Sequence, residues 1–367
     1  MITQVNRVDR MQEKTWSWLD VNTAQLHLYA QDEKREKGIR VEAPDGIEII
    51  QDFSEVSFPK AAEGFLTDQN SNRFFEEHSK LRYYIRIPEQ YRGEAPVRII
   101  FEAEEEGCVI DEDIVIEAQE KSEASVIFQY RSKNENVCFH SGRTRVLVRE
   151  NASLKLVKVQ LFNDGTAHHD TVQGIVEKKG SLSLVQAEMG SAGAAAGWNV
   201  LLAGEESQAD LDILYLGEKE KKLDFTSRVE LRGQKTGSRV RAKGILLGKS
   251  KKIFRDTLDF ISGAKGAAGR EEEDVLMLAD TVRNISVPLL FCGEDDVQGE
   301  HAATSGRPNE SILFYLMSRG LSDADARMLL AESKFAAALD KMDDKALKEE
   351  IVTFLRKSIE RDGYDNG

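Results

Sequence analysis

From Leu81 onward the chain is a succession of short β-prone runs separated by turns, and this repetition restricts its fold more than any other feature. Apolar and polar residues alternate in most runs, which is the period of a strand with one buried face. The runs include YYIRIP, VRIIFEA, ASVIFQY, TRVLVRE, LKLVKVQLF, ADLDILYLG and SRVRAKGILLG, and they continue to VPLLFC. No helical stretch interrupts them, so we expect an all-β body.

Serines recur just before the strands at nearly equal intervals. Ser122, Ser153, Ser181, Ser207 and Ser238 are separated by 31, 28, 26 and 31 residues. A period of this length made only of strands is typical of stacked coils, because each coil pairs its strands with the coils on either side and is not stable alone. The pattern favours a β-solenoid, with a closed β-sandwich as the competing fold.

The two ends of the chain have a different pattern from this body. Residues 1–80 are mixed, with a loop leading into a short helix at 65–78. Helical spacing over residues 10–30 runs through Trp18, Val21, Leu26 and Leu28. We therefore predict an N-terminal helical and mixed region over 1–80, a β body over 81–300 and a C-terminal helical module over 301–367.

Three helices are expected in the C-terminal module. Residues 308–320 form a helix that ends at Gly320. Ser322 and Asp325 have the spacing of an N-cap residue and an acidic third residue for the next helix. The last helix carries an apolar stripe at Leu347, Ile351, Phe354, Leu355 and Ile359.

Composition argues against several classes of function. Fifty basic and 64 acidic residues give a net charge of −14, which disfavours nucleic acid or an anionic membrane as the main partner. No apolar run reaches the roughly 18 residues of a membrane helix, and the charged N-terminus does not resemble a secretory signal. Three scattered cysteines, Cys108, Cys138 and Cys292, fit a reducing cytosol better than a disulfide framework. We expect a soluble cytoplasmic protein.

Catalytic and nucleotide-binding motifs are absent from the sequence. The glycine-rich stretches at 190–198 and 262–269 are not followed by Lys-Ser/Thr and a helix, so tight solenoid corners explain them better than a phosphate loop. A β-helix carbohydrate enzyme would need a ladder of carboxylates along one face, and the sequence has none. We expect no directly bound nucleotide.

Two short motifs are weak candidates for metal binding. In His168-His169-Asp170, consecutive side chains on a strand point to opposite faces, so only one of the histidines could face a shared site. Cys138 and His140 would share a face in an extended segment, but two residues make an incomplete site. A partly buried thiol is the commoner explanation for Cys138.

Cys292 and His301 are the stronger pair, with Glu294 and Glu300 in the acidic segment between them. Thiolate and imidazole suit iron, zinc and iron–sulfur clusters, and carboxylates can also bind iron. The alternative is a core thiol beside a solvated acidic turn. On chemistry alone both interpretations stay open.

At this stretch the chain resembles the SufB/SufD family of iron–sulfur cluster assembly proteins, over roughly residues 10 to 340. The matching segments are GEHAATSG (299–306), LFYLMSRGLS (313–322), FRDTLDFISGAKGAAGREEEDVLML (254–278), NISVPLL (284–290) and TWSWLDVN (15–22). The resemblance implies a right-handed parallel β-helix flanked by N-terminal and C-terminal helical regions. It also implies a non-enzymatic scaffold subunit for a transient iron–sulfur cluster.

The family resemblance implies partners as well. Family members pair through their β-helices, which here means a SufB/SufD-type paralogue or a second copy of the chain. They bind the ABC-type ATPase SufC through the C-terminal helices, which correspond to residues 308–341, and they work with a cysteine desulfurase that supplies sulfur. ATP hydrolysis would then belong to the partner.

The site residues depart from the family pattern in several places, and Gly299-Glu300-His301 stands where the partner branch has a Cys-Ser-His triplet. His301 matches the histidine that precedes the family's Ala-Thr stretch. Ala302 and Val282 stand where the scaffold branch has a glutamate and a cysteine, which favours a SufD-like or single-type subunit. The predicted cluster ligands are therefore Cys292 and His301, with Glu294 or Glu300 as the carboxylate. The alternative is an ATPase-coupled structural subunit that holds no cluster itself.

Overall fold

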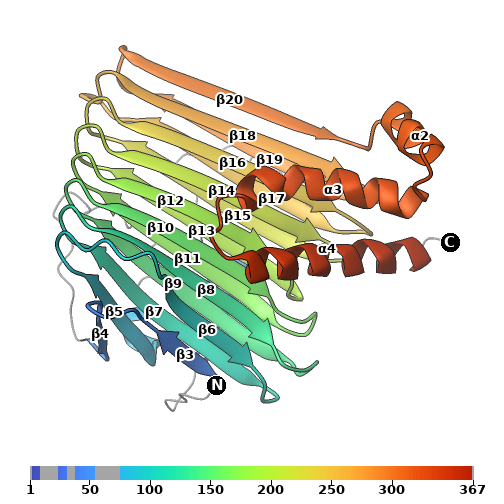
Figure 1. Ribbon diagram of the computed structural model, residues 1–367, viewed down its shortest axis with the longest axis horizontal. Coiled ribbons are helices and arrows are strands. Elements are labelled where there is room, and N and C mark those ends of the chain that lie inside the picture. Colours follow the sequence, from blue (N-terminus) through green and yellow to red (C-terminus); the bar gives the residue numbers. More distant parts are fainter. Residues whose placement is uncertain (1, 9–23, 31–37, 54–74, 366–367) are drawn as a thin grey trace.

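The computed structural model describes residues 2–8, 24–30, 38–53 and 75–365. Within them, two nine-stranded sheets form a parallel β-solenoid, as predicted (Figure 1). One sheet contains β3 (Ile39–Glu42), β6 (Val97–Ala103), β8 (Glu123–Ser132), β10 (Ser153–Leu161), β12 (Ser181–Glu188), β14 (Gln208–Gly217), β16 (Gly237–Leu246), β18 (Ala267–Met277) and β20 (Val297–Gly306). The other contains β4 (Glu48–Gln51), β5 (Leu81–Ile87), β7 (Cys108–Ala118), β9 (Cys138–Val148), β11 (Ala167–Val176), β13 (Gly193–Leu202), β15 (Lys222–Leu231), β17 (Lys251–Phe260) and β19 (Arg283–Cys292).

Two of the five recurring serines, Ser122 and Ser207, close corners between the strands of one rung. The other three belong to the strands that follow the corners: Ser153, Ser181 and Ser238. Lys121 and Glu206 have positive φ angles of 59° and 62°, so the chain reverses tightly at these residues. The next residues, Ser122 and Ser207, donate their hydroxyl groups to carbonyl oxygens three residues earlier, at 2.6 and 2.8 Å. At Gly190 a Cβ atom would lie 2.0 Å from a backbone oxygen, so this glycine permits close approach at a corner rather than phosphate binding.

The main core lies between the two sheets. Parallel pairing stacks like residues on one another, so that Leu154 is opposite Leu182 and Leu156 is opposite Leu184, all fully buried. Burying one such side chain stabilises the fold by about 1.5–3 kcal/mol. Because each interior residue contacts the rungs on both sides, the core is continuous along the solenoid.

Helices cover the outer face of the sheet that contains β8 to β18. These are α3 (Asp323–Leu339) and α4 (Lys345–Asp365), preceded by α2 (Glu310–Ser318) (Figure 1). Apolar residues of both helices, such as Phe335 and Ile351, pack against Val157 and Leu214 of the sheet. Within the described residues, no helix is both long enough and apolar enough to cross a membrane.

The predicted helix ends in the C-terminal module are confirmed. Gly320 has a φ angle of 99° and follows Arg319, the C-cap residue of α2. The Ser322 hydroxyl accepts a hydrogen bond from the Asp325 backbone N–H at 3.1 Å, and so caps α3. The predicted apolar stripe of α4 is present and packs against the sheet through Leu347, Ile351, Phe354, Leu355 and Ile359.

The helix expected over residues 10–30 is wrong where the structure describes that segment. Residues Ala24–Ala30 form β2, which pairs antiparallel with β1 (Ile2–Val8). Leu26 and Leu28 are spaced by two positions, which suits a strand as well as a helix, and pairing with β1 decides between them. Residues 10–23 lie outside the described residues. The short helix expected near 78 is present as one turn at 75–78.

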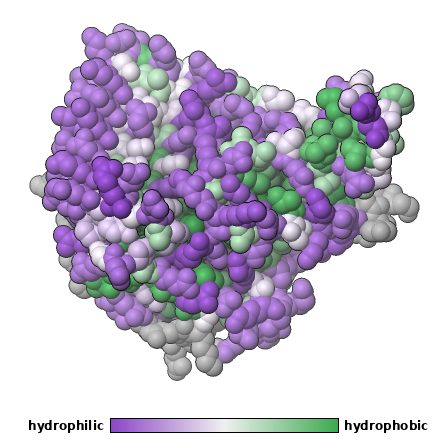
Figure 2. Space-filling view, in the orientation of Figure 1, coloured by the Kyte–Doolittle hydropathy of each residue, from purple (hydrophilic) through white to green (hydrophobic). Residues whose placement is uncertain are grey.

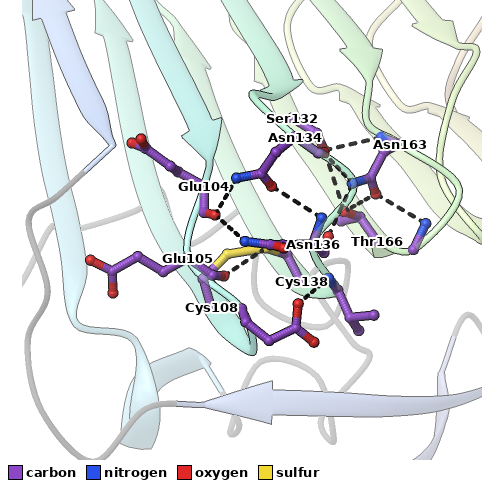
Figure 3. Close-up of a disulfide and its surroundings, with 12 residues drawn as sticks. Glu104, Glu105, Cys108, Ser132, Asn134, Asn136, Cys138, Asn163 and Thr166 are labelled. Atoms are coloured by element: carbon purple, nitrogen blue, oxygen red, sulfur yellow. Dashed lines mark hydrogen bonds between the residues drawn. A yellow bond between two sulfur atoms is a disulfide. The ribbon is translucent and has the colours of Figure 1, made fainter.

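The expectation that the cysteines stay unpaired is also wrong. Cys108 and Cys138 are opposite one another in the parallel register of β7 and β9, with Cα atoms 4.8 Å apart, and form a disulfide (Figure 3). Their separation of 30 residues equals one rung. Stacking therefore brings together two residues that are far apart in the sequence. Only Cys292 is a free cysteine among the described residues.

Asparagine side chains connect successive corners of the solenoid beside this disulfide through hydrogen bonds (Figure 3). The side-chain amides of Asn134 and Asn136 both donate to the Glu104 carbonyl oxygen, at 2.8 and 2.7 Å. One rung further, the Asn163 amide donates to the carbonyl oxygens of Asn134 and Asn136, at 2.6 and 3.0 Å. These bonds satisfy backbone carbonyl groups that lie outside the strand ladder.

Candidate functional site

The last rung places His301 against a buried carboxyl group. β18 and β20 pair in parallel, with Glu271 opposite His301. The His301 Nδ1 atom lies 3.3 Å from Glu271 Oε2, and the side chains are 28% and 1% exposed. His301 therefore stands between solvent and the interior. Partial burial lowers the pKa of His301, so at neutral pH the ring is a neutral imidazole that can act as a ligand.

Behind His301, Glu271 and Asp256 form a buried carboxyl pair. The two groups hydrogen-bond to one another, and both residues are buried. Burial raises the pKa of Asp256 to about 7; burial and the charge of Asp256 raise that of Glu271 to about 11. Asp256 Oδ1 and Glu271 Oε1 have no hydrogen-bond partner among the described residues. Such a pair holds a proton and can exchange it for a cation.

A neighbouring carboxylate, Glu273, is already neutralised. It forms an ion pair with Lys252 and accepts hydrogen bonds from Ser286 and from the Tyr215 hydroxyl, the last at 2.9 Å. Lys252 and Tyr215 are fully buried, so the Lys252 ammonium group and the Tyr215 hydroxyl interact with Glu273 and not with solvent. This interior ion pair leaves Glu271 and Asp256 as the acids available to His301.

The acid pair predicts an unusual dependence of stability on pH. Both carboxyl groups have raised pKa values in the folded protein, so they keep their protons at pH values where the same groups are ionised in the unfolded chain. For Glu271 the unfolded chain releases the proton around the ordinary pKa of 4.5. Stability must therefore fall as pH rises from that value toward the raised pKa values. The slope is at most about 1.4 kcal/mol per pH unit for each proton.

We expect Glu271→Gln to flatten this decline, measured as the unfolding temperature from about pH 5 to about pH 9. Glu300→Gln, which removes an exposed carboxylate, should keep the wild-type slope; an equally steep slope in Glu271→Gln would contradict the assignment.

Cys292 and His301 lie on the last strand of each sheet, β19 and β20. Cys292 ends β19 and its side chain is exposed. Between the two residues, Leu290 faces Gly299, where a Cβ atom would lie 3.1 Å from the Leu290 methyl groups. Both residues nevertheless belong to the last strands of the solenoid, so a thiol and an imidazole are presented at the same open end.

Glu294 and Glu300 are occupied by local structure. The Glu294 carboxylate accepts backbone hydrogen bonds from Gly263 at 3.0 Å and from Asp295 at 3.1 Å, and so closes a turn. These bonds lower the pKa of Glu294. Glu300 lies 3.4 Å from Arg270 and lines a surface groove, on the opposite side of β20 from His301. The four predicted ligands are thus not brought into one cluster.

Sequence reasoning missed Glu271 and Asp256. A signal was present, because Glu271 precedes His301 by 30 positions, which is one rung. Asp256 comes from β17 in the other sheet, and only the closing of the solenoid brings it to Glu271.

The open end also exposes unpaired strand edges. β19 and β20 are the last strands in their sheets, and most of their side chains are exposed or half-buried. Within the described residues their outer edges have no strand partner. Free N–H and C=O groups along such an edge can pair with another chain.

Comparisons with known proteins find similarity to one family. The model of the SUF system FeS cluster assembly SufBD core domain matches residues 100–334, which include His301, Glu271 and Asp256. The iron–sulfur cluster assembly protein SufD of Bacillus subtilis is 23% identical over 278 residues, 75% of this chain and 64% of that protein. A SufBD family protein of Pyrococcus horikoshii is 24% identical over 278 residues, 76% of this chain and 61% of that protein. One from Staphylococcus epidermidis is 23% identical over 248 residues, 67% of this chain and 53% of that protein. The chain thus spans between half and two thirds of the length of these relatives.

Proposed function

The chain belongs to the SufBD family of iron–sulfur cluster assembly proteins, and from that premise we propose that it is a cytoplasmic scaffold subunit on which a transient iron–sulfur cluster is built. The contact of His301 with the buried Asp256–Glu271 pair at the open end supports this most directly. A neutral imidazole beside a carboxyl group that can lose its proton suits Fe²⁺. The subunit is not itself a catalyst, and ATP hydrolysis belongs to a partner.

Iron and sulfur would reach this end through different residues. His301 and Glu271 would bind iron. The exposed Cys292 thiol would accept sulfur delivered by a cysteine desulfurase system, because a thiolate is both a nucleophile toward persulfide sulfur and a cluster ligand. Glu294 and Glu300 have no ligand role in this proposal, since one caps a turn and the other pairs with Arg270.

The open edges of β19 and β20 would form the dimer interface. Pairing these edges with a paralogue or a second copy would extend the sheets and enclose the face that presents Cys292 and His301. A cluster held there would gain ligands from both subunits, which compensates for the single thiol of this chain.

The helix α2 would bind an ABC-type ATPase. Of the residues on α2 only Leu313 is buried, whereas Ile312, Phe314, Tyr315 and Met317 are exposed. Figure 2 shows hydrophobic residues gathered at the end of the molecule where α2 lies. An apolar patch of this kind on a water-exposed helix indicates a protein–protein contact.

Anaerobic reconstitution with ferrous iron and sulfide tests the cluster site. We expect the wild type to develop visible charge-transfer absorption, and we expect the Cys292→Ser/His301→Ala double variant to lose most of it. Glu300→Gln alters a nearby exposed carboxylate and should absorb like the wild type. Wild-type absorption in the double variant would show that these residues do not hold the cluster.

A second candidate is a structural subunit that holds no cluster. It is favoured by the scarcity of thiols, because Cys108 and Cys138 are joined in a disulfide and only Cys292 is free among the described residues. Co-purification distinguishes the two functions. A complex with a cysteine-rich paralogue, in which the double variant still supports cluster formation, would favour the structural role.

A further inference from the structure

A second polar cluster lies inside the solenoid, away from His301. It consists of His140 on β9, His168 and Asp170 on β11, and Glu188 on β12, all at most 3% exposed. β12 and β20 are four strand steps apart in one sheet, which corresponds to about 19 Å. The two sites are therefore separate.

Three of these residues converge on one point. Ligand atoms of His168, Asp170 and Glu188 all lie within 4.8 Å of one another. The His168 Nε2 atom is 3.2 Å from Glu188 Oε2. This is close to the separation of about 3.3 Å expected between two ligands bound to one ion at about 2.0–2.2 Å.

The His168 Nε2 atom is fully buried yet makes no aligned hydrogen bond among the described residues, in spite of its closeness to Glu188. Its other ring nitrogen, Nδ1, lies 2.9 Å from the Nδ1 atom of His140. If His168 donates this Nδ1 proton to His140, its Nε2 lone pair faces the carboxylates. A metal-bound histidine is usually held in this way by a partner at its second nitrogen.

The surrounding residues orient the two carboxylates. Gln186 donates to Asp170 at 2.9 Å and to Glu188 at 2.7 Å, and Trp198 fixes Gln186 by donating to its oxygen at 2.7 Å. These bonds leave each carboxylate with lone pairs that are not used, because a carboxylate oxygen has two.

Buried carboxyl groups outnumber the buried lysine beside this cluster. Lys158 donates to Asp170 at 2.7 Å, and its charge also acts on Glu112 and Glu188, so three buried carboxyl groups surround one buried lysine. Gly142 allows the carboxyl groups to approach closely, because a Cβ atom there would lie 2.8 Å from Asp170 Oδ1 and 2.9 Å from Glu112 Oε1. A cation would balance the excess carboxylate charge, whose burial is otherwise costly.

We propose that His168, Asp170 and Glu188 bind one divalent transition-metal ion inside the solenoid, with His140 orienting His168. One imidazole and two carboxylates suit Fe²⁺, Zn²⁺ or Co²⁺. Of the two adjacent histidines in the His-His-Asp motif, His168 shares a face with Asp170. His169 faces the other side of β11 and stacks on Phe75 with ring centroids 6.1 Å apart.

Cobalt binding tests this proposal. The full chain is made in the Cys292→Ser/His301→Ala background, so that ions held at the open end do not contribute, and is produced and dialysed in Co²⁺. We expect one bound Co²⁺ per chain by elemental analysis, with visible d–d absorption of nitrogen and oxygen ligation. His168→Gln should reduce Co²⁺ affinity by at least about 100-fold, and His140→Gln by about 10- to 100-fold.

His169→Gln is the matched control, because it changes the neighbouring buried histidine on the opposite face of the same strand. It should retain the cobalt spectrum and affinity. If His168→Gln does not fold, Glu188→Gln, which preserves shape and removes the charge, replaces it with the same expected loss. The proposal is wrong if the parent protein takes up no stoichiometric Co²⁺, or if His169→Gln lowers affinity as much as His168→Gln.

Discussion

Replacing Phe314 and Tyr315 with alanine is expected to weaken binding of the ABC-type ATPase by at least about 100-fold while leaving the fold unchanged. The two side chains are 74% and 60% exposed, so they contribute little to the solenoid or to the packing of α3 and α4. Truncating a central aromatic residue of an interface typically costs about 2 kcal/mol or more. Two such losses exceed the roughly 2.8 kcal/mol that corresponds to a hundredfold change in the dissociation constant.

Titration calorimetry with the purified ATPase measures this loss, and circular dichroism checks the fold. Ile50→Ala is a suitable control, because Ile50 is also an exposed apolar residue, 38% exposed, but lies on β4 at the opposite end of the solenoid. This control should bind within about twofold of the wild type. Wild-type affinity in the Phe314/Tyr315 variant would show that α2 is not the docking surface.

Asp113→Ala is expected to be a strongly destabilising change, by about 3–5 kcal/mol. Asp113 is fully buried on β7 and accepts paired hydrogen bonds from two guanidinium groups of β9. Arg143 donates to it at 3.0 and 2.8 Å, and Arg145 at 3.2 and 2.8 Å. Removing the carboxylate takes the shared acceptor from two arginines whose side chains are 2% and 12% exposed. A buried charge that loses its partner costs more than the pair contributes.

The shift in the urea midpoint measures this effect, and hydrogen exchange in β7 and β9 locates it. Glu123→Gln provides the contrast, because Glu123 pairs with Arg92 at 2.9 Å where both side chains are more than 60% exposed. An exposed pair of this kind contributes about 1 kcal/mol or less. A shift for Asp113→Ala as small as that for Glu123→Gln would mean that the buried pair is not important for stability.

Much of the fold was predictable because its signals are local. Alternation along each run indicated strands, and small residues such as Ser122 and Ser207 marked corners between them. The caps at Gly320 and Ser322 depend on neighbours within a few residues, so they too were predicted correctly. Residues 24–30 were not, because a strand and a helix fit the same leucines and β1 decided between them.

Local patterns in the sequence are sufficient to predict a body of stacked strands and the capped helices that follow it, and the family motif singles out His301. The partner of each residue follows from the three-dimensional stacking of the rungs, which joins Cys108 to Cys138, His301 to Glu271, and His168 to Glu188. These contacts depend on the register between the strands of neighbouring rungs. Each contact joins residues one rung apart or on opposite sheets, and which side chains meet depends on the length of every corner between them. The alternation of apolar and polar residues shows which side chains face inward, whereas the stacking of the rungs decides which residues those side chains contact.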